Sequence, residues 1–343
     1  MTDELAEAAK ARLPRAVWDF AAGGAGAERT LAANRAAFDR VALVPRVLTG
    51  SVPDPATRLL GTGMTMPVAV APVAYLRMYH PDGDLAVAAA ARRAGIPFTA
   101  AMLGSHTIEE IRPDWFQLYW PRDRGLMLDL VRRAERAGCS ALMVTVDMPV
   151  MARRDRDVRN RFTLPDGVTA ANLVPDGRAR EGSTVVAHTN TLFDPAVSWA
   201  DLDWLRSRTA LPIALKGVLD PRDAARAVAA GVDAVVVSNH GGRQLDGAVP
   251  AVDALPGVRE AVGEHSQVLL DSGVRSGLDV VRALALGADG VLIGRPLVWA
   301  LSVGGTDGAA HVLRSLRDEL CEVLALTGCG TVGDARELAT ARM

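Results

Sequence analysis

Residues 220–239 read DPRDAARAVAAGVDAVVVSN, a helical pattern that ends at Gly231 and is followed, two residues later, by an apolar run. The same order recurs at Gly95, Gly138 and Gly287, before FTAAM, ALMVTV and GVLIG. Glycine just past a helix takes the left-handed conformation that ends the helix, and the chain then turns into a strand. Because the apolar runs do not alternate with polar residues, we expect parallel strands covered on both faces.

Less regular copies of this unit raise the number of expected strands to eight. They lie at residues 66–72, 98–102, 115–120, 141–147, 213–217, 234–239, 267–273 and 290–295, and helical patterns separate most of them. Eight alternating β–α units predict an α/β fold of the (β/α)8 type, a TIM barrel. The alternative is a doubly wound open sheet, which is disfavoured because no Gly-x-Gly-x-x-Gly sequence follows the first strand.

The 343 residues are expected to form a single domain. Residues 1–62 are predicted as an N-terminal helical segment, 63–303 as the barrel and 304–343 as C-terminal helices. A long excursion, residues 148–198, follows the fourth strand. A connection of that length inside a compact domain is usually functional, so we expect an active-site loop.

Composition and charge exclude several classes of protein. The 38 basic and 40 acidic residues nearly balance, which argues against a nucleic-acid partner. The three cysteines (Cys139, Cys321 and Cys329) have no metal-ligand spacing, which favours a reducing, cytoplasmic compartment and no metal site. The uncharged run from Leu59 to Leu76 contains prolines and glycines, so it favours a loop entering a buried strand over a membrane helix. No secretory leader pattern opens the chain, and we expect a soluble protein without a membrane partner.

Polar residues at the carboxyl ends of the expected strands are informative, because barrel active sites are built there. The third strand brings Gln117 and Tyr119. The fourth ends in Thr145 and Asp147. The fifth ends on Lys216, one of only two lysines. A lysine buried in an apolar strand is costly unless it meets an anion, so it is either a ligand contact or part of a structural ion pair.

The stretch SNHGGRQLDG, residues 238–247, follows the sixth strand. It gathers Ser238, His240 and Arg243 around two glycines that permit a tight turn. Histidine is suited to proton abstraction near neutral pH, and the planar guanidinium group of arginine is suited to a carboxylate. At this place in a barrel we interpret the group as a substrate site, the alternative being a structural histidine.

The last two strands end in DSGVRSG and GRP. These segments contribute Asp271, Gly273 and Arg275 after the seventh strand, and Gly294 and Arg295 after the eighth. In many barrels the same two loops hold a phosphate through backbone N–H groups and a helix N-terminus. The sequence therefore predicts a phosphate-anchored cofactor beside the histidine and arginine, the alternative being surface arginines that cap helices.

The stretch SNHGGRQLDG resembles that of the FMN-dependent α-hydroxy-acid oxidase and dehydrogenase family, which includes glycolate oxidase, lactate oxidase and mandelate dehydrogenase. The resemblance runs in order through LPRAVWDFAAGGAG, APVAYLRMYHPDGD, FQLYW, TVDMPVMARRDRDVRNRF, LPIALKGVL, LLDSGVRSG and GADGVLIGRP. Within the family it is greatest to oxidases of 4-hydroxymandelate, which serve antibiotic biosynthesis. It implies FMN as cofactor, a 2-hydroxy acid and O2 as small-molecule partners, and a homo-oligomer, commonly a tetramer.

The resemblance also implies roles on the substrate side. His240 would be the active-site base, and Asp147 would stabilise its protonated form. Arg154 and Arg243 would hold the substrate carboxylate. Tyr119 would contact the reacting hydroxyl or the carboxylate.

On the cofactor side, Lys216 would lie by the N1–C2=O edge of the flavin and favour the anionic reduced ring. The other residues would line the isoalloxazine ring (Gln117, Thr145, Ser238 and the backbone near Ala74), reach the ribityl chain (Asp271) and hold the phosphate (Gly273, Arg275, Gly294 and Arg295).

Two positions depart from the family pattern. In the N-terminal segment, where the family commonly has a tyrosine that contacts the substrate carboxylate, this chain has Phe20. The loss of that hydroxyl makes the pocket more apolar and favours an aromatic 2-hydroxy acid over glycolate. After the second strand, where many members have a serine near the flavin, the chain reads AAMLG with Ala101 and Met102. A flavin hydrogen bond there would come from the backbone or be absent.

We therefore expect FMN-dependent oxidation of (S)-4-hydroxymandelate or mandelate to the 2-oxo acid, 4-hydroxybenzoylformate or benzoylformate, with O2 reduced to H2O2. The alternatives are an L-lactate or glycolate oxidase, or a mandelate dehydrogenase with another electron acceptor. Other classes are a non-oxidative FMN-barrel isomerase and a barrel without catalytic activity. The sequence leaves open whether hydrogen leaves the α-carbon as a hydride or as a proton.

Overall fold

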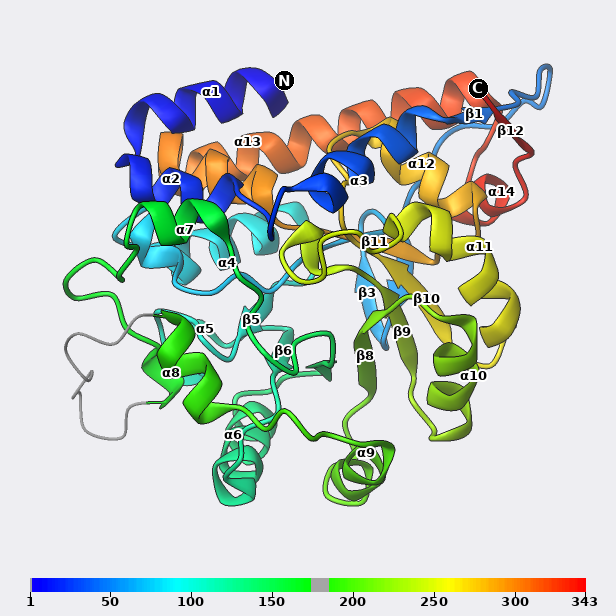
Figure 1. Ribbon diagram of the computed structural model, residues 1–343. Helices are drawn as coiled ribbons and strands as arrows, with labels where there is room; N and C mark the ends of the chain where they lie inside the picture. The colour runs from blue at the N-terminus through cyan, green and yellow to red at the C-terminus, as the bar shows by residue number, and fades with distance from the viewer. Residues whose placement is uncertain (1, 174–184) are drawn as a thin grey trace.

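The computed structural model describes residues 2–173 and 185–343 (Figure 1). Within those ranges, eight parallel strands lie side by side in the order β4-β11-β10-β9-β8-β7-β6-β5. The strands are β4 (Val68–Val70), β5 (Thr99–Ala101), β6 (Trp115–Leu118), β7 (Ala141–Thr145), β8 (Ile213–Val218), β9 (Ala234–Val237), β10 (Gln267–Leu270) and β11 (Gly290–Ile293). A parallel bridge between Val70 and Phe98 joins the two outer strands. The predicted (β/α)8 barrel is therefore confirmed.

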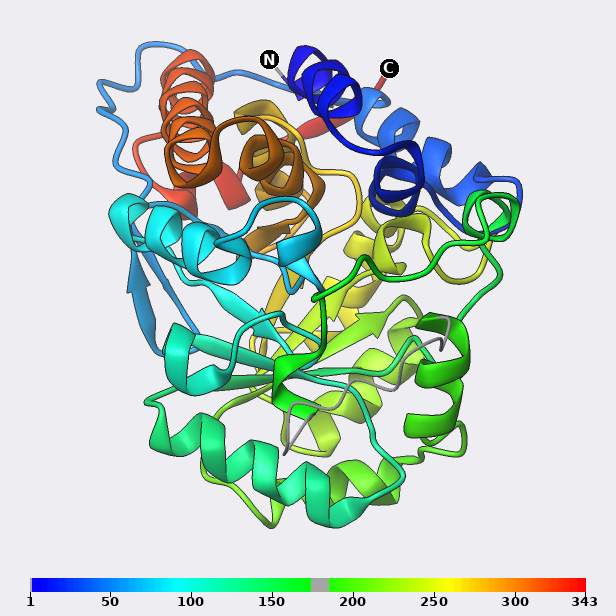
Figure 2. The same ribbon diagram turned by 90° about the vertical axis from the view of Figure 1, so that its left-hand side faces the viewer.

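Helices surround this barrel (Figures 1 and 2). They are α4 (Gly83–Ala94), α5 (Ile108–Ile111), α6 (Arg124–Arg136), α9 (Trp199–Arg206), α10 (Pro221–Ala229), α11 (Ala251–Val262), α12 (Gly277–Ala285) and α13 (Arg295–Thr327). The glycines of the sequence repeat have the left-handed backbone that was predicted, with φ of 65° at Gly95 and 74° at Gly231. Each one ends a helical turn and directs the chain into the next strand.

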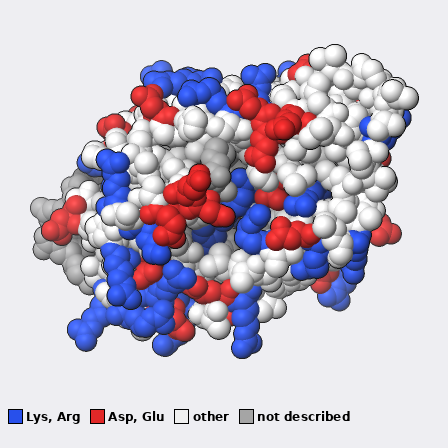
Figure 3. Space-filling model, turned by 90° about the horizontal axis from the view of Figure 1, so that it is seen from above, with Lys and Arg blue, Asp and Glu red and all other residues white. Residues whose placement is uncertain are grey.

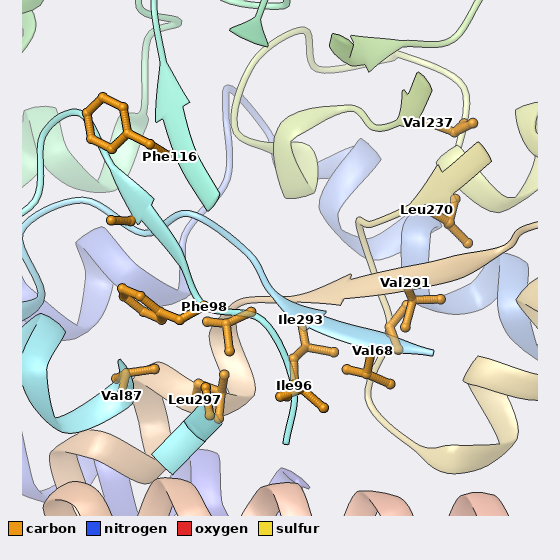
Figure 4. Close-up of a cluster of buried hydrophobic side chains, with 14 of the residues drawn as sticks. Val68, Val87, Ile96, Phe98, Phe116, Val237, Leu270, Val291, Ile293 and Leu297 are labelled. Atoms are coloured by element: carbon orange, nitrogen blue, oxygen red, sulfur yellow. The ribbon is translucent and has the colours of Figure 1, made fainter. Parts of the chain in front are cut away.

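The strand residues pack in two layers, one inside the barrel and one between the barrel and its helices. Ala69 and Leu292 belong to the inner cluster. Their neighbours Val68 and Ile293 belong to the outer cluster, which also contains Leu297 of α13. Figure 4 shows these outer side chains. Burial on both faces explains why the strands read as unbroken apolar runs.

The N-terminal segment covers one end of the molecule. It forms α1 (Thr2–Arg12), α2 (Arg15–Ala22) and α3 (Arg29–Asp39), and α1 lies along α13 (Figure 1). Three short strands, β1 (Val41–Leu43), β2 (Thr57–Leu59) and β3 (Thr62–Met64), then precede the barrel. The sequence did not indicate these strands. They have three residues each, and none of them is a fully buried apolar run.

Two of these short strands close the amino end of the barrel. The β2–β3 hairpin places Leu59, Leu60 and Met64 in the inner cluster, beside Trp115. The indole nitrogen of Trp115 also donates a hydrogen bond to Thr62 Oγ1 at 3.3 Å. The carboxyl ends of the strands are thereby left as the end of the barrel that can form a site.

The C-terminal segment contains more than the predicted helices. α13 has a non-helical break at Gly304 and Gly305, and α14 (Val332–Arg336) follows it. The last strand, β12 (Thr340–Arg342), pairs antiparallel with β1. Chain segments about 300 residues apart, Val41 and Arg342, are thus register partners.

The excursion after β7 is partly helical. It contains α7 (Asp155–Arg159), η2 (Ala171–Leu173) and α8 (Val185–Leu192), while residues 174–184 of the predicted loop lie outside the described residues. Arg156 of α7 pairs with Glu28 at 2.5 Å and with Asp19 at 3.4 Å. These ion pairs anchor the start of the loop to the N-terminal helices.

Among the helices of the described residues, none has the length and apolar character that crossing a membrane requires. The face seen from above in Figure 3 carries basic and acidic side chains interspersed with one another.

Candidate active site

A cavity of about 1190 Å³, including its open mouth, lies at the carboxyl ends of the strands. Most of the residues predicted for the site line it: Phe20, Ala74, Tyr119, Thr145, Arg154, Lys216, His240, Arg243, Asp271, Gly273, Arg275, Gly294 and Arg295. The other three predicted residues lie behind this wall, and each is hydrogen-bonded to a residue that lines it. Gln117 donates to Thr145 at 3.0 Å, Lys216 donates to Ser238 at 2.9 Å, and Asp147 accepts from His240 at 2.8 Å.

The histidine is held by the carboxylate of Asp147. Nδ1 of His240 lies 2.8 Å from Asp147 Oδ1. Burial opposes ionisation of Asp147, but the interactions with His240 and Lys216 outweigh burial and hold the pKa of this carboxyl below its ordinary value. Because a carboxylate only accepts hydrogen bonds, Nδ1 carries the proton and Nε2 is free to act as a base. Nε2 lies 3.5 Å from the Tyr119 hydroxyl.

The backbone around this pair is unusual. His240 has a φ of 59°, in the left-handed region that non-glycine residues rarely adopt, and its N–H donates to Ser238 Oγ at 3.0 Å. Gly217 lies at an irregularity in the pairing of β8 with β9, and a Cβ there would be 2.5 Å from Asp147 Cβ. The glycine lets Asp147 lie close to β8, a requirement that was not predicted from the sequence.

Lys216 joins a buried polar network. The register of β7 and β8 puts it beside Thr145, and its Nζ lies 2.9 Å from Asp271 Oδ2 and 2.9 Å from Ser238 Oγ. Burial lowers the pKa of this lysine, but the carboxylates of Asp271 and Asp147 outweigh burial and raise it. The two interpretations that the sequence left open are compatible, because Lys216 is in an ion pair and also lines the cavity.

Two arginines meet at the ring of Phe20. The guanidinium groups of Arg154 and Arg243 lie 5.6 Å and 5.0 Å from its centroid, within the range of cation–π attraction. Phe162 stacks on the same ring at 4.5 Å. Burial lowers the pKa of Arg154 to about 9, and the charge of Arg243 contributes to this. Two like charges that face one cavity, one of them on the buried Arg154, favour an anionic ligand.

Two residues beside these arginines were not predicted from the sequence. Tyr79 lines the cavity, although its motif APVAYLRMYHPDGD was part of the family resemblance. Asp157 lies 4.0 Å from Arg154, and burial raises its pKa. Neither residue ends a barrel strand, so the search for polar residues at strand ends could not find them.

The ends of β10 and β11 form a second basic region. α13 begins at Arg295, and both Arg275 and Arg295 line the cavity, which disagrees with the alternative of surface arginines that cap helices. Burial and the charge of Arg35 lower the pKa of Arg275 to about 10. Burial and the charges of Arg243 and Arg275 lower the pKa of Arg295 well below its ordinary value. Crowded cations beside a helix N-terminus fit the phosphate of FMN.

The region after β5 also fits a flavin ring, without a serine. The backbone N–H of Met102 donates to Gln117 Oε1 at 3.2 Å, and the Gln117 amide donates to Thr145. Gln117 is thereby fixed in one orientation behind the cavity wall. Together with Lys216, these residues give a polar wall suited to the carbonyl and nitrogen atoms of a flavin.

Gly273 provides a test of the phosphate end. Its φ is 121°, and a Cβ there would lie 2.8 Å from the backbone oxygen of Asn34. We expect Gly273→Ala to lower the stability of the fold by about 1–3 kcal/mol and to reduce the FMN content, because the loop must move. Thermal unfolding and the ratio of FMN to protein measure both effects. Gly63→Ala, where a Cβ would meet nothing within 4 Å, is the control, and equal losses in both variants would contradict the argument.

Comparison with known proteins agrees with this geometry. Residues 9–341 match the family described as FMN-dependent dehydrogenase. A 4-hydroxymandelate oxidase of Amycolatopsis orientalis is 50% identical, over 98% of this chain and 97% of that protein. An L-lactate oxidase of Nostoc sp. is 44% identical, over 96% and 95%.

Solved structures extend the likeness to three dimensions. The crystal structure of mandelate oxidase with (S)-4-hydroxymandelic acid has a TM-score of 0.94 and 49% identity, covering 99% of this chain and 98% of that one. The family resemblance predicted from the sequence, with FMN as the cofactor, is thereby confirmed. The chain belongs to the FMN-dependent dehydrogenase family.

Proposed function

We propose that this enzyme oxidises (S)-4-hydroxymandelate or mandelate to the corresponding 2-oxo acid and passes the electrons to O2, which becomes H2O2. The observation that carries the proposal is that His240, held by Asp147, lines one cavity together with Arg154 and Arg243. A base and a carboxylate-binding pair are what oxidation of a 2-hydroxy acid requires. The likeness to 4-hydroxymandelate oxidase and mandelate oxidase supports the choice of acid.

In this proposal each residue has one task. Arg154 and Arg243 bind the substrate carboxylate and so orient the α-carbon. Nε2 of His240 accepts a proton from the substrate, and Asp147 stabilises the resulting imidazolium. The hydride and carbanion routes differ in which proton His240 accepts, but both place the same positive charge beside Asp147. FMN, when bound, takes up the two electrons that leave the substrate.

The cofactor is held by the remaining polar residues. Gly273, Arg275, Gly294 and Arg295 hold the phosphate in this proposal, and Asp271 lies toward the ribityl chain. Thr145 and the backbone near Ala74 would line the ring, and Gln117 and Ser238 would support this wall through their hydrogen bonds to Thr145 and Lys216. Lys216 provides a fixed positive charge where the ring becomes more negative on reduction.

The walls of the cavity support an aromatic acid. Phe20, Leu103, Met148 and Met151 all line it. Tyr119, which also lines it, packs against Phe193 with ring centroids 4.9 Å apart. An aryl group buried against such side chains gains more from the hydrophobic effect than the methyl group of lactate. Lactate and glycolate remain the alternative substrates.

We also propose that the enzyme acts in the cytoplasm as a homo-oligomer, a tetramer by its resemblance to the family. The three cysteines are free, and two of them, Cys139 and Cys329, are buried, which is compatible with a reducing compartment. Sedimentation or light scattering of the FMN-loaded protein measures its assembly state.

The deciding experiment is anaerobic mixing of the purified enzyme with (S)-mandelate, (S)-4-hydroxymandelate, L-lactate and glycolate, followed through the visible flavin band. We expect rapid bleaching by the two mandelates, and recovery with peroxide formation when air is admitted. Bleaching by lactate or glycolate alone would contradict the choice of substrate. Bleaching by mandelates without peroxide would favour a dehydrogenase, and no bleaching by any acid would favour a non-oxidative flavoenzyme.

A further inference from the structure

The hydroxyl of Tyr79 faces the active-site cavity. Tyr79 follows η1 (Leu76–Met78), a turn fixed by the hydrogen bond from Tyr79 N to Leu76 O at 3.1 Å. Its side chain is buried and lines the cavity. Among the described residues, the structure shows no hydrogen-bond partner for this hydroxyl. The indole nitrogens of Trp120 and Trp299 also have no partner among the described residues, but they are fully inaccessible, and the Tyr79 oxygen is not one of these inaccessible atoms. The Tyr79 hydroxyl is therefore open to whatever fills the cavity.

The surroundings of this hydroxyl are cationic. Burial raises the pKa of Tyr79 to about 12, while Arg243, Arg154 and Arg295 act in the opposite direction. Tyr79 is thus a neutral phenol at physiological pH and has a proton to donate. Guanidinium groups are donors only, so they attract the phenol oxygen and leave its O–H for an acceptor. An anion bound between the arginines is such an acceptor.

In residues 2–173 and 185–343, no acceptor is hydrogen-bonded to the Tyr79 hydroxyl. Asp157 is the nearby carboxylate that acts on Tyr79, but its Oδ1 is buried without a partner among the described residues. The ring of Phe20, which also contacts Arg243, has no hydroxyl group. The backbone oxygen of Phe20 already accepts a hydrogen bond from Arg243 at 2.5 Å. The hydroxyl of Tyr119 lies 3.5 Å from Nε2 of His240, so it is placed beside the reacting atoms.

We propose that Tyr79 is a third carboxylate-binding residue, whose hydroxyl donates a hydrogen bond to the substrate carboxylate held by Arg154 and Arg243. A carboxylate has about four lone-pair directions, so it can accept from two guanidinium groups and a phenol together. Charge-assisted bonds of this kind are stronger than neutral ones. The inference rests on the proposed function only in taking the substrate to be a 2-hydroxy acid, and it holds for aryl and alkyl acids alike.

The test is Tyr79→Phe in the FMN-loaded, full-length enzyme. Removing a hydroxyl that has no hydrogen-bond partner among the described residues leaves none of their buried groups unsatisfied, so the variant is expected to fold and to retain FMN. Anaerobic stopped-flow mixing with (S)-mandelate, (S)-4-hydroxymandelate and L-lactate gives a dissociation constant and a limiting rate of flavin reduction for each acid. Binding of benzoylformate, read from the shift in the flavin spectrum, gives an affinity that does not depend on turnover.

We expect the dissociation constants of all these acids to rise about tenfold or more, with the limiting reduction rate changed by less than about threefold, because the bond is present before and during the reaction. The ratio of variant to wild-type affinity should be constant between about pH 6 and pH 9, since Tyr79 stays protonated there. A merely structural role would instead change the rate and the FMN content together.

Tyr75→Phe is the matched control. Tyr75 is a second buried phenol in the cavity wall, and the shift in its pKa has burial and Tyr119 as causes, with no arginine among them. We expect its removal to change benzoylformate affinity less than about twofold. Unchanged benzoylformate binding in Tyr79→Phe would overturn the proposal. A loss confined to (S)-4-hydroxymandelate would also overturn it, because the hydroxyl would then recognise the ring substituent.

The proposed function and the proposed role of Tyr79 can each fail without the other. If the wild-type enzyme is reduced by L-lactate and not by the mandelates, the proposed function fails, and the role of Tyr79 is read from lactate affinity alone. If the mandelates reduce the enzyme and Tyr79→Phe binds every acid as tightly as the wild type, the proposed function stands and the role of Tyr79 fails.

Discussion

Replacing His240 with alanine is expected to slow reduction of the flavin by substrate by about 10²–10⁴-fold, the range over which a positioned general base contributes to a rate. The variant should still bind FMN. The predicted phosphate contacts come from residues at the ends of β10 and β11, and Lys216 keeps its ion pair with Asp271 at 2.9 Å. Anaerobic stopped-flow measurement of the flavin band gives the rate, and the ratio of FMN to protein gives the cofactor content.

The matched control for this prediction is Asp147→Asn. Asparagine keeps the size of the side chain and can still accept a hydrogen bond from Nδ1 of His240, but it removes the negative charge that stabilises the imidazolium. A loss smaller than that of His240→Ala is therefore expected. Fast reduction retained in His240→Ala would remove this residue from the role of base, even if Asp147→Asn were slow.

The same pair makes a prediction about acid stability. The pKa of Asp147 is lowered in the folded state, so this carboxylate contributes stability at pH values above its ordinary unfolded pKa. The contribution is lost as the pH falls through the depressed folded value. Thermal unfolding of wild type and Asp147→Asn should therefore converge at acidic pH, and a constant difference down to about pH 2 would contradict this.

The fold could be predicted because its repeat is local. About 20 consecutive residues are enough to recognise a helix that ends at a left-handed glycine, such as Gly231, and is followed by an apolar run. Pairings between distant segments cannot be recognised from consecutive residues. Val41 pairs with Arg342, and Asn34 donates to Asn239 at 2.8 Å, although neither contact leaves a pattern in the neighbouring residues.

The residues of the candidate site that lie at strand ends were predicted from the sequence. His240, Lys216 and Thr145 could be found because polar residues are unusual at the ends of buried strands. Tyr79 and Asp157 lie in a turn and in a loop helix, where polar residues are ordinary, so only the folded chain shows them beside the arginines. The sequence showed that Phe20 lacks the hydroxyl group common in the family. The structure adds that the guanidinium groups of Arg154 and Arg243 lie over its ring.

Lys216→Met is expected to slow flavin reduction and to weaken the addition of sulfite at flavin N5, because both place negative charge on a ring that would lose its neighbouring cation. The substitution also leaves Asp271 buried without its partner. Breaking a buried pair in this way costs about 3–5 kcal/mol, so the stability of the fold should fall as well. Sulfite affinity is measured by titration of the oxidised flavin, and stability by thermal unfolding.

The two effects of Lys216 can be separated with the double variant Lys216→Met/Asp271→Asn, which removes the unpaired carboxylate and should recover part of the lost stability. If Lys216 acts on the flavin, sulfite affinity stays low in the double variant, because the cation is still absent. If Lys216 serves only as the partner of Asp271, sulfite affinity and stability recover together. The second result would leave the buried ion pair as the whole explanation for a charged residue in an otherwise apolar strand, and it would remove Lys216 from the flavin site.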